Sequence, residues 1–103
     1  MSNPVAGKER AYNEWYDGQH LGDVLKVPGF VSAQRFSFVS KINDVPHWRY
    51  CALYTIESDD PASVVAELTR RVASGEIYVS DGIDSQVYAA VYGPLGEELI
   101  AAS

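Results

Sequence analysis

The first third of the chain alternates apolar and polar positions with the period of an α-helix. Over residues 8–17 one face of such a helix is apolar and the opposite face is polar, the apolar positions being Ala11, Tyr12, Trp15 and Tyr16. Gly18 interrupts the pattern, and a second helical segment follows over residues 20–26, with Leu21, Val24 and Leu25 directed inward. Pro28 and Gly29 end it. If the helix instead runs unbroken through Gly18, Tyr16 and His20 share a face.

Residues 30–40 and 47–57 have the two-residue alternation of β-strands, and residues 41–46 form a hairpin-like connection between them. Alternation divides the first strand into two sides, Phe30, Ser32, Gln34, Phe36 and Phe38 against Val31, Ala33, Arg35, Ser37 and Val39. The second strand carries Trp48, Tyr50, Ala52, Tyr54 and Ile56 on one side. Neither side of the first strand is fully polar, so we expect both faces of this sheet to be largely covered.

A third helix is predicted from its start and stop signals. Asp60 is the expected N-cap, Pro61 fits the first helical position, and Ser74-Gly75 marks the end. The expected buried stripe of this helix is Val64, Val65, Leu68 and Val72. Residues 76–84 form an irregular stretch whose embedded apolar residues suggest that it folds over another part of the protein. Residues 85–92 are predicted to be the last strand, and the mildly apolar tail over residues 95–103 is expected to dock on a neighbour.

The predicted order is helix, strand, strand, helix, strand. A ferredoxin-like split βαβ sandwich needs one more strand at the front. Residues 2–6 are short and polar, so either a first strand is missing or this segment forms only a stub. We expect residues 1–103 to form a single α+β domain.

Composition narrows the class of function. The chain has 103 residues, a net charge of −6 and no run of basic residues, which argues against binding to nucleic acid or to an anionic membrane surface. Its single cysteine, Cys51, excludes an internal disulfide, and no close spacing of His and Cys suggests a metal site. With no signal peptide or membrane span recognisable, we expect a soluble, cytoplasmic protein. Seven Tyr and two Trp fit either a ring-stiffened core or a ring-lined pocket.

The run from Asn13 to Phe30 resembles the dimeric α+β barrel superfamily, and within it the small EthD-like proteins. The residues that carry the resemblance are Asn13, Trp15, Tyr16, Asp17, His20, Leu21, Asp23, Val24, Leu25, Val27, Pro28, Gly29 and Phe30. Ala33-Gln34-Arg35-Phe36 and Val79-Ser80-Asp81 are also similar to that group. The resemblance implies a homodimer in which two four-stranded sheets form one barrel, with a cavity in each subunit between sheet and helices. It also implies a His of the first helix at the cavity mouth.

His20 is the first candidate for chemistry, because imidazole takes and returns a proton near neutral pH. The alternative is a structural His bonded to backbone at the helix break. Tyr16 can hold a substrate oxygen or simply pack. Asp23 can orient His20 by accepting its second N–H, or it can cap the second helical segment, which we favour slightly.

Five further residues are candidates for substrate binding: Trp15, Arg35, Tyr50, Tyr78 and Asp81. Adjacent helix positions point about 100° apart, so Trp15 and Tyr16 are not expected to line the same wall. Arg35 can hold a substrate oxyanion, but pairing with an Asp or Glu of the helix or of another subunit is the favoured interpretation. Tyr78 and Asp81, in the stretch before the last predicted strand, can form a second wall with Tyr50 or instead dock at a dimer interface.

Two remaining residues are read as structural. Cys51 is expected to be a small core residue, and His47, near a turn, is expected to be exposed.

The preferred function is a cofactor-independent acid/base enzyme, a cyclase, isomerase or dehydratase/lyase, with His20 as acid/base. The substrate would be a small aromatic, polyketide-like or lactone compound. One alternative is a cofactor-free oxygenase or a haem-degrading protein, in which His20 or His47 would be the axial ligand. The other is a ligand-binding or interaction domain without turnover.

Overall fold

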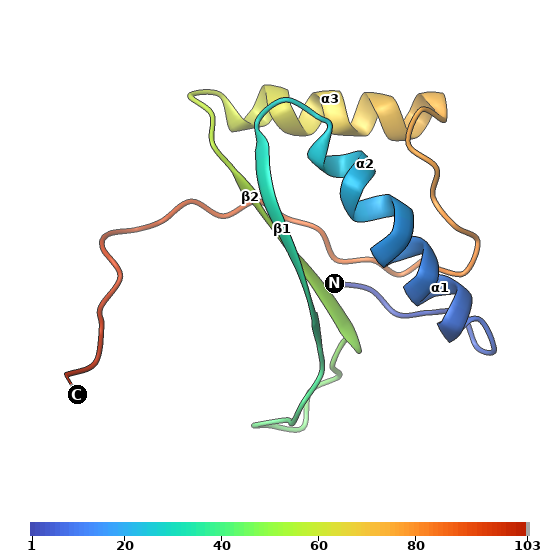
Figure 1. The fold of residues 1–103 in the computed structure, drawn as a ribbon. Helices are drawn as coiled ribbons and strands as arrows, with labels where there is room; N and C mark the ends of the chain where they lie inside the picture. Colours follow the sequence, from blue (N-terminus) through green and yellow to red (C-terminus); the bar gives the residue numbers. More distant parts are fainter. Residues whose placement is uncertain (103) are drawn as a thin grey trace.

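The computed structural model describes residues 1–102 and has a mixed α+β architecture (Figure 1). In chain order the elements are α1 (Glu9–Trp15), the π-helical segment η1 (Tyr16–His20), α2 (Leu21–Leu25), β1 (Phe30–Ser37), β2 (Tyr50–Ile56) and α3 (Pro61–Ser74). The predicted α+β class is therefore confirmed. Ser103, the last residue of the predicted docking tail, lies outside the described residues.

The first helix does not break at Gly18. The backbone at both ends of η1 is right-handed helical, and the Leu21 N–H donates to the carbonyl of Tyr16, five residues earlier. The predicted interruption is therefore wrong, and the continuous helix is confirmed, with one widened turn of the kind that often marks functional sites. A Cβ on Gly18 would meet no atom within 4 Å, so this side of the turn is open. Two residues of the expected inner face, Ala11 and Leu25, are exposed instead.

The predicted hairpin is confirmed, although both of its strands are shorter than expected. β1 and β2 pair antiparallel, from Ser37 opposite Tyr50 to Phe30 opposite Ile56. Ser32 lies opposite Thr55, so Val31 is an extra residue in β1 and forms a β-bulge. The bulge shifts the alternation by one residue. The predicted side that joined Phe30 to Ser32, Gln34 and Phe36 is therefore wrong.

Only one face of this sheet is covered by the chain itself. Phe30 is buried in the core and the Arg35 guanidinium donates to a helix residue, so their side of the sheet faces the helices. On the opposite side Phe36 and Leu53 are 43% and 60% exposed. Within the described chain, the expectation that both faces are covered is wrong.

The N-terminal residues lie along the second edge of β2. Ser2 and Tyr50 exchange backbone hydrogen bonds of 3.1 and 3.3 Å. On its other side the N-terminal segment bonds to residues 82–88, with Val5 N–H donating to Gly82 and Asp84 N–H donating to Asn3. The predicted stub at residues 2–6 is confirmed. The spatial order is residues 82–88, residues 1–5, β2 and β1, and the bridges at both new contacts are antiparallel.

Residues 85–92 do not form the predicted strand. Tyr88 exchanges hydrogen bonds with Met1, at 2.9 and 2.6 Å, but from residue 89 on the described chain makes no backbone hydrogen bond to another segment. A strand exists only where a neighbour completes its ladder, and this segment lacks one.

The core connects α2, β1, α3 and the segment after α3, through Val24, Val27, Phe30, Val64 and Ile77. Ile77 is 4% exposed, and the carbonyl of Tyr78 accepts the Trp15 indole N–H at 3.2 Å. The irregular stretch over residues 76–84 thus folds over the first helix, as predicted.

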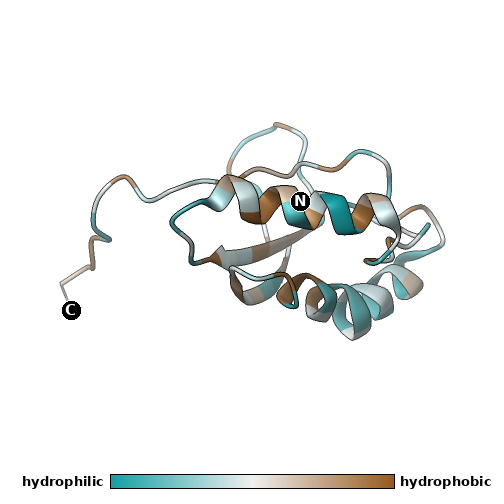
Figure 2. Cartoon of the chain, turned by 90° about the horizontal axis from the view of Figure 1, so that it is seen from above, coloured by the Kyte–Doolittle hydropathy of each residue, from teal (hydrophilic) through white to brown (hydrophobic). Residues whose placement is uncertain are grey.

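The predicted bounds of α3 are confirmed. The Asp60 carboxylate accepts the Ser63 N–H at 3.3 Å, Pro61 occupies the first turn, and Gly75 ends the helix with φ of 85°. Figure 2 shows the alternation of hydrophobic and hydrophilic bands along the helices, and the tail extending away from them. No helix among residues 1–102 is long and apolar enough to cross a membrane.

Candidate functional site

A cavity of about 620 Å³ lies between the helices and the sheet. Trp15, Tyr16, His20 and Val24 line it from the first helical stretch, and Leu68 and Val72 line it from α3. β2 contributes Ala52 and Tyr54, and the remaining wall is formed by residues 83–92 and Met1. A volume of this size suits a small organic molecule.

The π turn brings three rings to the same wall of this cavity. The centroid of the His20 imidazole lies 4.5 Å from that of the Trp15 indole and 5.1 Å from that of the Tyr16 phenol. An α-helix would place residues 15 and 20 about 140° apart, whereas the wider η1 turn lets them stack. The expectation that Trp15 and Tyr16 line different walls is therefore wrong. Trp15 is held in place by its indole N–H bond to the carbonyl of Tyr78.

Two buried polar atoms of the lining residues have no partner. His20 Nδ1 and Tyr54 Oη are each buried and bonded to no atom of the described chain. An unpaired buried polar group costs free energy, typically about 1–3 kcal/mol, and such groups are uncommon in folded proteins. A bound molecule with a suitably placed oxygen would satisfy both. The interpretation of His20 as bonded to backbone at a helix break is not borne out, because the helix does not break.

Burial sets the protonation states in the cavity. It lowers the pKa of the His20 imidazole, and the charge of Asp23 raises that pKa by a smaller amount. Burial also raises the pKa of Tyr16, with a further contribution from the nearby Tyr12 phenol, and it raises the pKa of Tyr54 far above its usual range. At neutral pH the cavity therefore presents a neutral imidazole and two neutral phenols.

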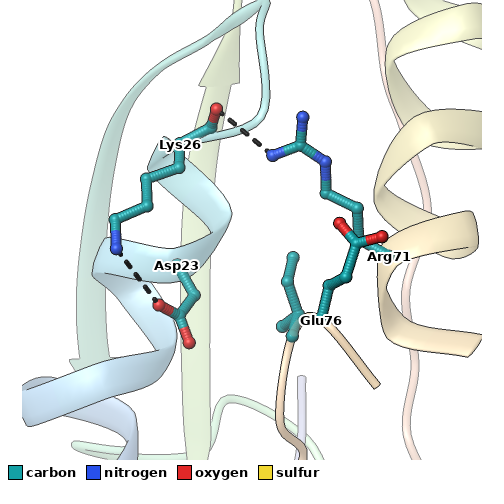
Figure 3. Close-up of a pocket in the computed structure, with 5 residues that line it drawn as sticks. Asp23, Lys26, Arg71 and Glu76 are labelled. Carbon is teal, nitrogen blue, oxygen red and sulfur yellow. Dashed lines mark hydrogen bonds and ion pairs between the residues drawn. The ribbon is translucent and has the colours of Figure 1, made fainter. Parts of the chain in front are cut away.

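Asp23 does not bond to His20. Its carboxylate lies 3.8 Å from the Lys26 ammonium, and no side-chain cap is present at α2, so the cap interpretation is wrong. Figure 3 shows Asp23 in a separate hollow of about 120 Å³ between α2 and the end of α3, where the Arg71 guanidinium donates to the Lys26 carbonyl at 3.4 Å. Asp23 acts on His20 only through its charge in this structure.

Arg35 is bound by the helix, which was the favoured interpretation. Its guanidinium donates to Asn13 at 2.8 Å and to Asp17 at 3.0 Å. The guanidinium carbon also lies 4.5 Å from the centroid of the Tyr16 ring and 5.0 Å from that of Tyr50. Arg35 is not part of the cavity lining. It fixes the helix against the sheet and holds Tyr16 from behind.

The predicted second wall is not assembled around the cavity. The Tyr50 hydroxyl donates to Glu9 at 2.9 Å and accepts from Asn13 at 3.3 Å, Tyr78 is 52% exposed, and Asp81 pairs with Lys8 at the surface. None of the three lines the cavity.

The two residues read as structural lie as follows. Cys51 is half-buried in β2. His47 is half-buried rather than exposed, with its ring centroid 5.2 Å from that of Phe38.

The sequence analysis missed Tyr54 as a site residue. It lies on the same strand side as Tyr50, and only its position further along β2, opposite Ala33, places it at the cavity rather than at α1. An alternation pattern shows which side a residue takes but not which of two tyrosines on that side finds a partner.

Among residues 1–102 no group of three or more His, Cys, Asp or Glu residues is placed to hold a metal ion. Comparisons of the chain with protein-family models, with curated proteins and with solved structures find no match.

Proposed function

We propose that this protein is a cofactor-independent acid/base enzyme that acts on a small, neutral, oxygenated ring compound. The reaction class is cyclisation, isomerisation or elimination of water, and the substrate class is aromatic, polyketide-like or lactone. The observation that carries the proposal is the pair of unpartnered buried atoms, His20 Nδ1 and Tyr54 Oη, in one ring-lined cavity.

The protonation states support this assignment of roles. A neutral imidazole can accept a proton from substrate and return it, and a lowered pKa keeps His20 in that form at neutral pH. Tyr54 and Tyr16 retain their protons, so either can donate a hydrogen bond to an oxygen on which negative charge develops. Tyr16 stands beside the His20 ring at 5.1 Å, and Arg35 behind it favours charge transfer toward its phenol.

The lining favours a neutral substrate. No Lys or Arg side chain lines the cavity, and the charged groups that do are Asp84 and the terminal ammonium of Met1, which is already bonded to the Tyr88 carbonyl. A carboxylate or phosphate would enter without a free cationic partner, which is costly in a mostly apolar site.

We further propose a ferredoxin-like arrangement and an EthD-like homodimer. The antiparallel order of residues 82–88, residues 1–5, β2 and β1 is the order of the split βαβ sandwich, with its first and last segments reduced to isolated bridges. The exposed Phe36 and Leu53 on the outer sheet face supply an apolar surface for a second copy.

The test is a thermal-shift screen of the wild type, His20→Gln and Tyr54→Phe against neutral phenols, lactones, quinols, aromatic acids and haemin. We expect a neutral oxygenated ring compound to stabilise the wild type and to lose most of that effect in both variants. Positive compounds would then be assayed for turnover by product analysis.

Other outcomes of the screen point elsewhere. Stabilisation by haemin alone would favour a haem-degrading protein or an oxygenase. Binding that depends on His20 without any product would favour a ligand-binding domain. Equal responses of all three proteins would refute the proposed site.

A further inference from the structure

The edge of β2 that faces away from β1 is open along most of its length. Tyr50 uses its N–H and C=O on Ser2, and β1 is the only strand paired with β2 among residues 1–102. Backbone groups of alternate residues in an antiparallel strand point to the same edge, so those of Ala52 and Tyr54 point where those of Tyr50 do. The described chain provides no backbone partner for them there.

A second segment faces the same space. Tyr88 exchanges two hydrogen bonds with Met1, and both Ala90 and Tyr92, further along that segment, line the same cavity as Ala52 and Tyr54. The N-terminal segment lies between Tyr50 and Tyr88 and is antiparallel to both neighbours at its bridges. The space beyond Met1 therefore continues a strand position that Ser2 already occupies.

The C-terminal tail is a segment without contacts that matches this position. Figure 1 shows it running away from the helices and strands, and Leu99 and Ile100 are 96% and 85% exposed. Residues 99–102 read Leu-Ile-Ala-Ala, with no charge and no proline. At about 3.3 Å per residue, six residues span roughly 20 Å, enough to cover the open part of β2.

We propose that residues 97–102 of a second copy of this chain occupy the open edge of β2 as an additional strand. The exchanged strand runs in the direction of the N-terminal segment, antiparallel to β2, and its alternate side chains point to the cavity and to the outer face. Because each copy has one tail and one open edge, reciprocal exchange closes a two-fold dimer. The exchanged strand then completes the sheet side of the cavity beside Tyr54. This inference rests on backbone edges and on the tail, not on the proposed reaction.

The first experiment measures molar mass by light scattering across micromolar concentrations. The wild type is expected to be a dimer, and the double variant Leu99→Asp/Ile100→Asp a monomer. Leu95→Asp, an equally exposed position before the exchanged strand, is the matched control and should stay dimeric. Phe36→Asp tests the outer sheet face separately.

A mixing experiment identifies the partner. One variant lacks residues 97–103, and the other carries Ala52→Pro, which removes an N–H from the open edge; proline is tolerated at edge strands. Each variant alone should be monomeric, whereas a mixture should form a heterodimer through one exchanged tail. Circular dichroism checks that both variants fold.

Three outcomes would overturn the proposal. A dimer that survives Leu99→Asp/Ile100→Asp would show that the tail does not hold it together, and loss of the dimer in Phe36→Asp alone would assign it to the outer sheet face. A monomeric wild type that is destabilised by the tail variant would show that the tail folds back on its own chain. A monomer indifferent to the variant would show that the tail binds nowhere.

Discussion

The rings of Trp15 and His20 lie 4.5 Å apart, centroid to centroid, although four residues separate them in the sequence. The contact exists because η1 inserts a π turn between α1 and α2, and it makes Trp15 a reporter of the protonation of His20. An imidazolium quenches a neighbouring indole more strongly than a neutral imidazole does.

The first prediction uses this contact. In a Trp48→Phe background, the fluorescence of Trp15 should fall as the pH is lowered, with a midpoint below 6.5, because burial lowers the pKa of His20. Fluorescence recorded between pH 4 and 8 measures the midpoint. The same titration of His20→Gln should be flat, and a midpoint above 6.5 would contradict the buried placement of the imidazole.

The second prediction concerns stability and pH. A base whose pKa is lowered by folding binds fewer protons in the folded state than in the unfolded state, so the free energy of unfolding rises with pH in that interval. The contribution of His20 should be complete above about pH 7, and it should be lost as the pH falls through the unfolded value near 6.5 toward the lower folded value. Urea unfolding of the wild type and of His20→Gln at several pH values isolates this contribution. A variant with the same pH dependence as the wild type would show that His20 is not desolvated.

The third prediction compares two tyrosine hydroxyls. Tyr54 Oη has no partner in the described chain, so Tyr54→Phe should leave the free energy of unfolding unchanged or raise it slightly. Tyr12 Oη lies 2.6 Å from Ser2 Oγ in a buried hydrogen bond, so Tyr12→Phe should cost about 1 kcal/mol. Chemical denaturation of both variants measures the difference. A loss in Tyr54→Phe as large as that in Tyr12→Phe would mean that the Tyr54 hydroxyl is satisfied within the protein.

Local signals predicted α3 and the hairpin, but not the details that form the cavity. Asp60 and Gly75 have direct chemical reasons to be caps, and a helix with both can be read from its own residues. The π turn at Tyr16–His20 and the bulge at Val31 are single-residue insertions into regular elements, and nothing in the local composition of either segment demands them. Both change which side chains share a face. Sequence reasoning therefore identified His20 and Tyr16 correctly as neighbours and misplaced Trp15.

Partner choice was the other limit. Arg35 was expected to find an acidic partner, and it did, because an unpaired buried charge is costly anywhere in a fold. Tyr50 and Tyr54 are identical side chains on one strand side, and only the distance of each from α1 decides that Tyr50 bonds to Glu9 while Tyr54 bonds to nothing described.

The fourth prediction tests the role of Arg35. Its side chain is 12% exposed and joins Asn13, Asp17 and the faces of Tyr16 and Tyr50, so Arg35→Met should lower the free energy of unfolding by roughly 1–3 kcal/mol. Arg49 pairs with Glu9 at the surface, with 56% of its side chain exposed, and Arg49→Met should cost less than about 1 kcal/mol. Thermal and urea unfolding of the two variants provide the comparison. Equal losses would show that Arg35 is no more than a surface ion pair.

The fifth prediction separates backbone strain from steric clash at two glycines. Gly29 and Gly75 have φ of 105° and 85°, so an alanine at either position is strained by about 1 kcal/mol. At Gly75 the new Cβ meets no atom within 4 Å, and Gly75→Ala should cost little more than that. At Gly29 the Cβ would lie 2.6 Å from Val64 Cγ2, where the loop before β1 packs on α3, so Gly29→Ala should cost a further 1–3 kcal/mol or so from overpacking. Adding Val64→Ala to Gly29→Ala removes the clash and should leave a loss smaller than the sum of the two single variants, which a double-mutant cycle measures. Additive losses would mean that the loop moves away from α3 and that Gly29 is required for its φ alone.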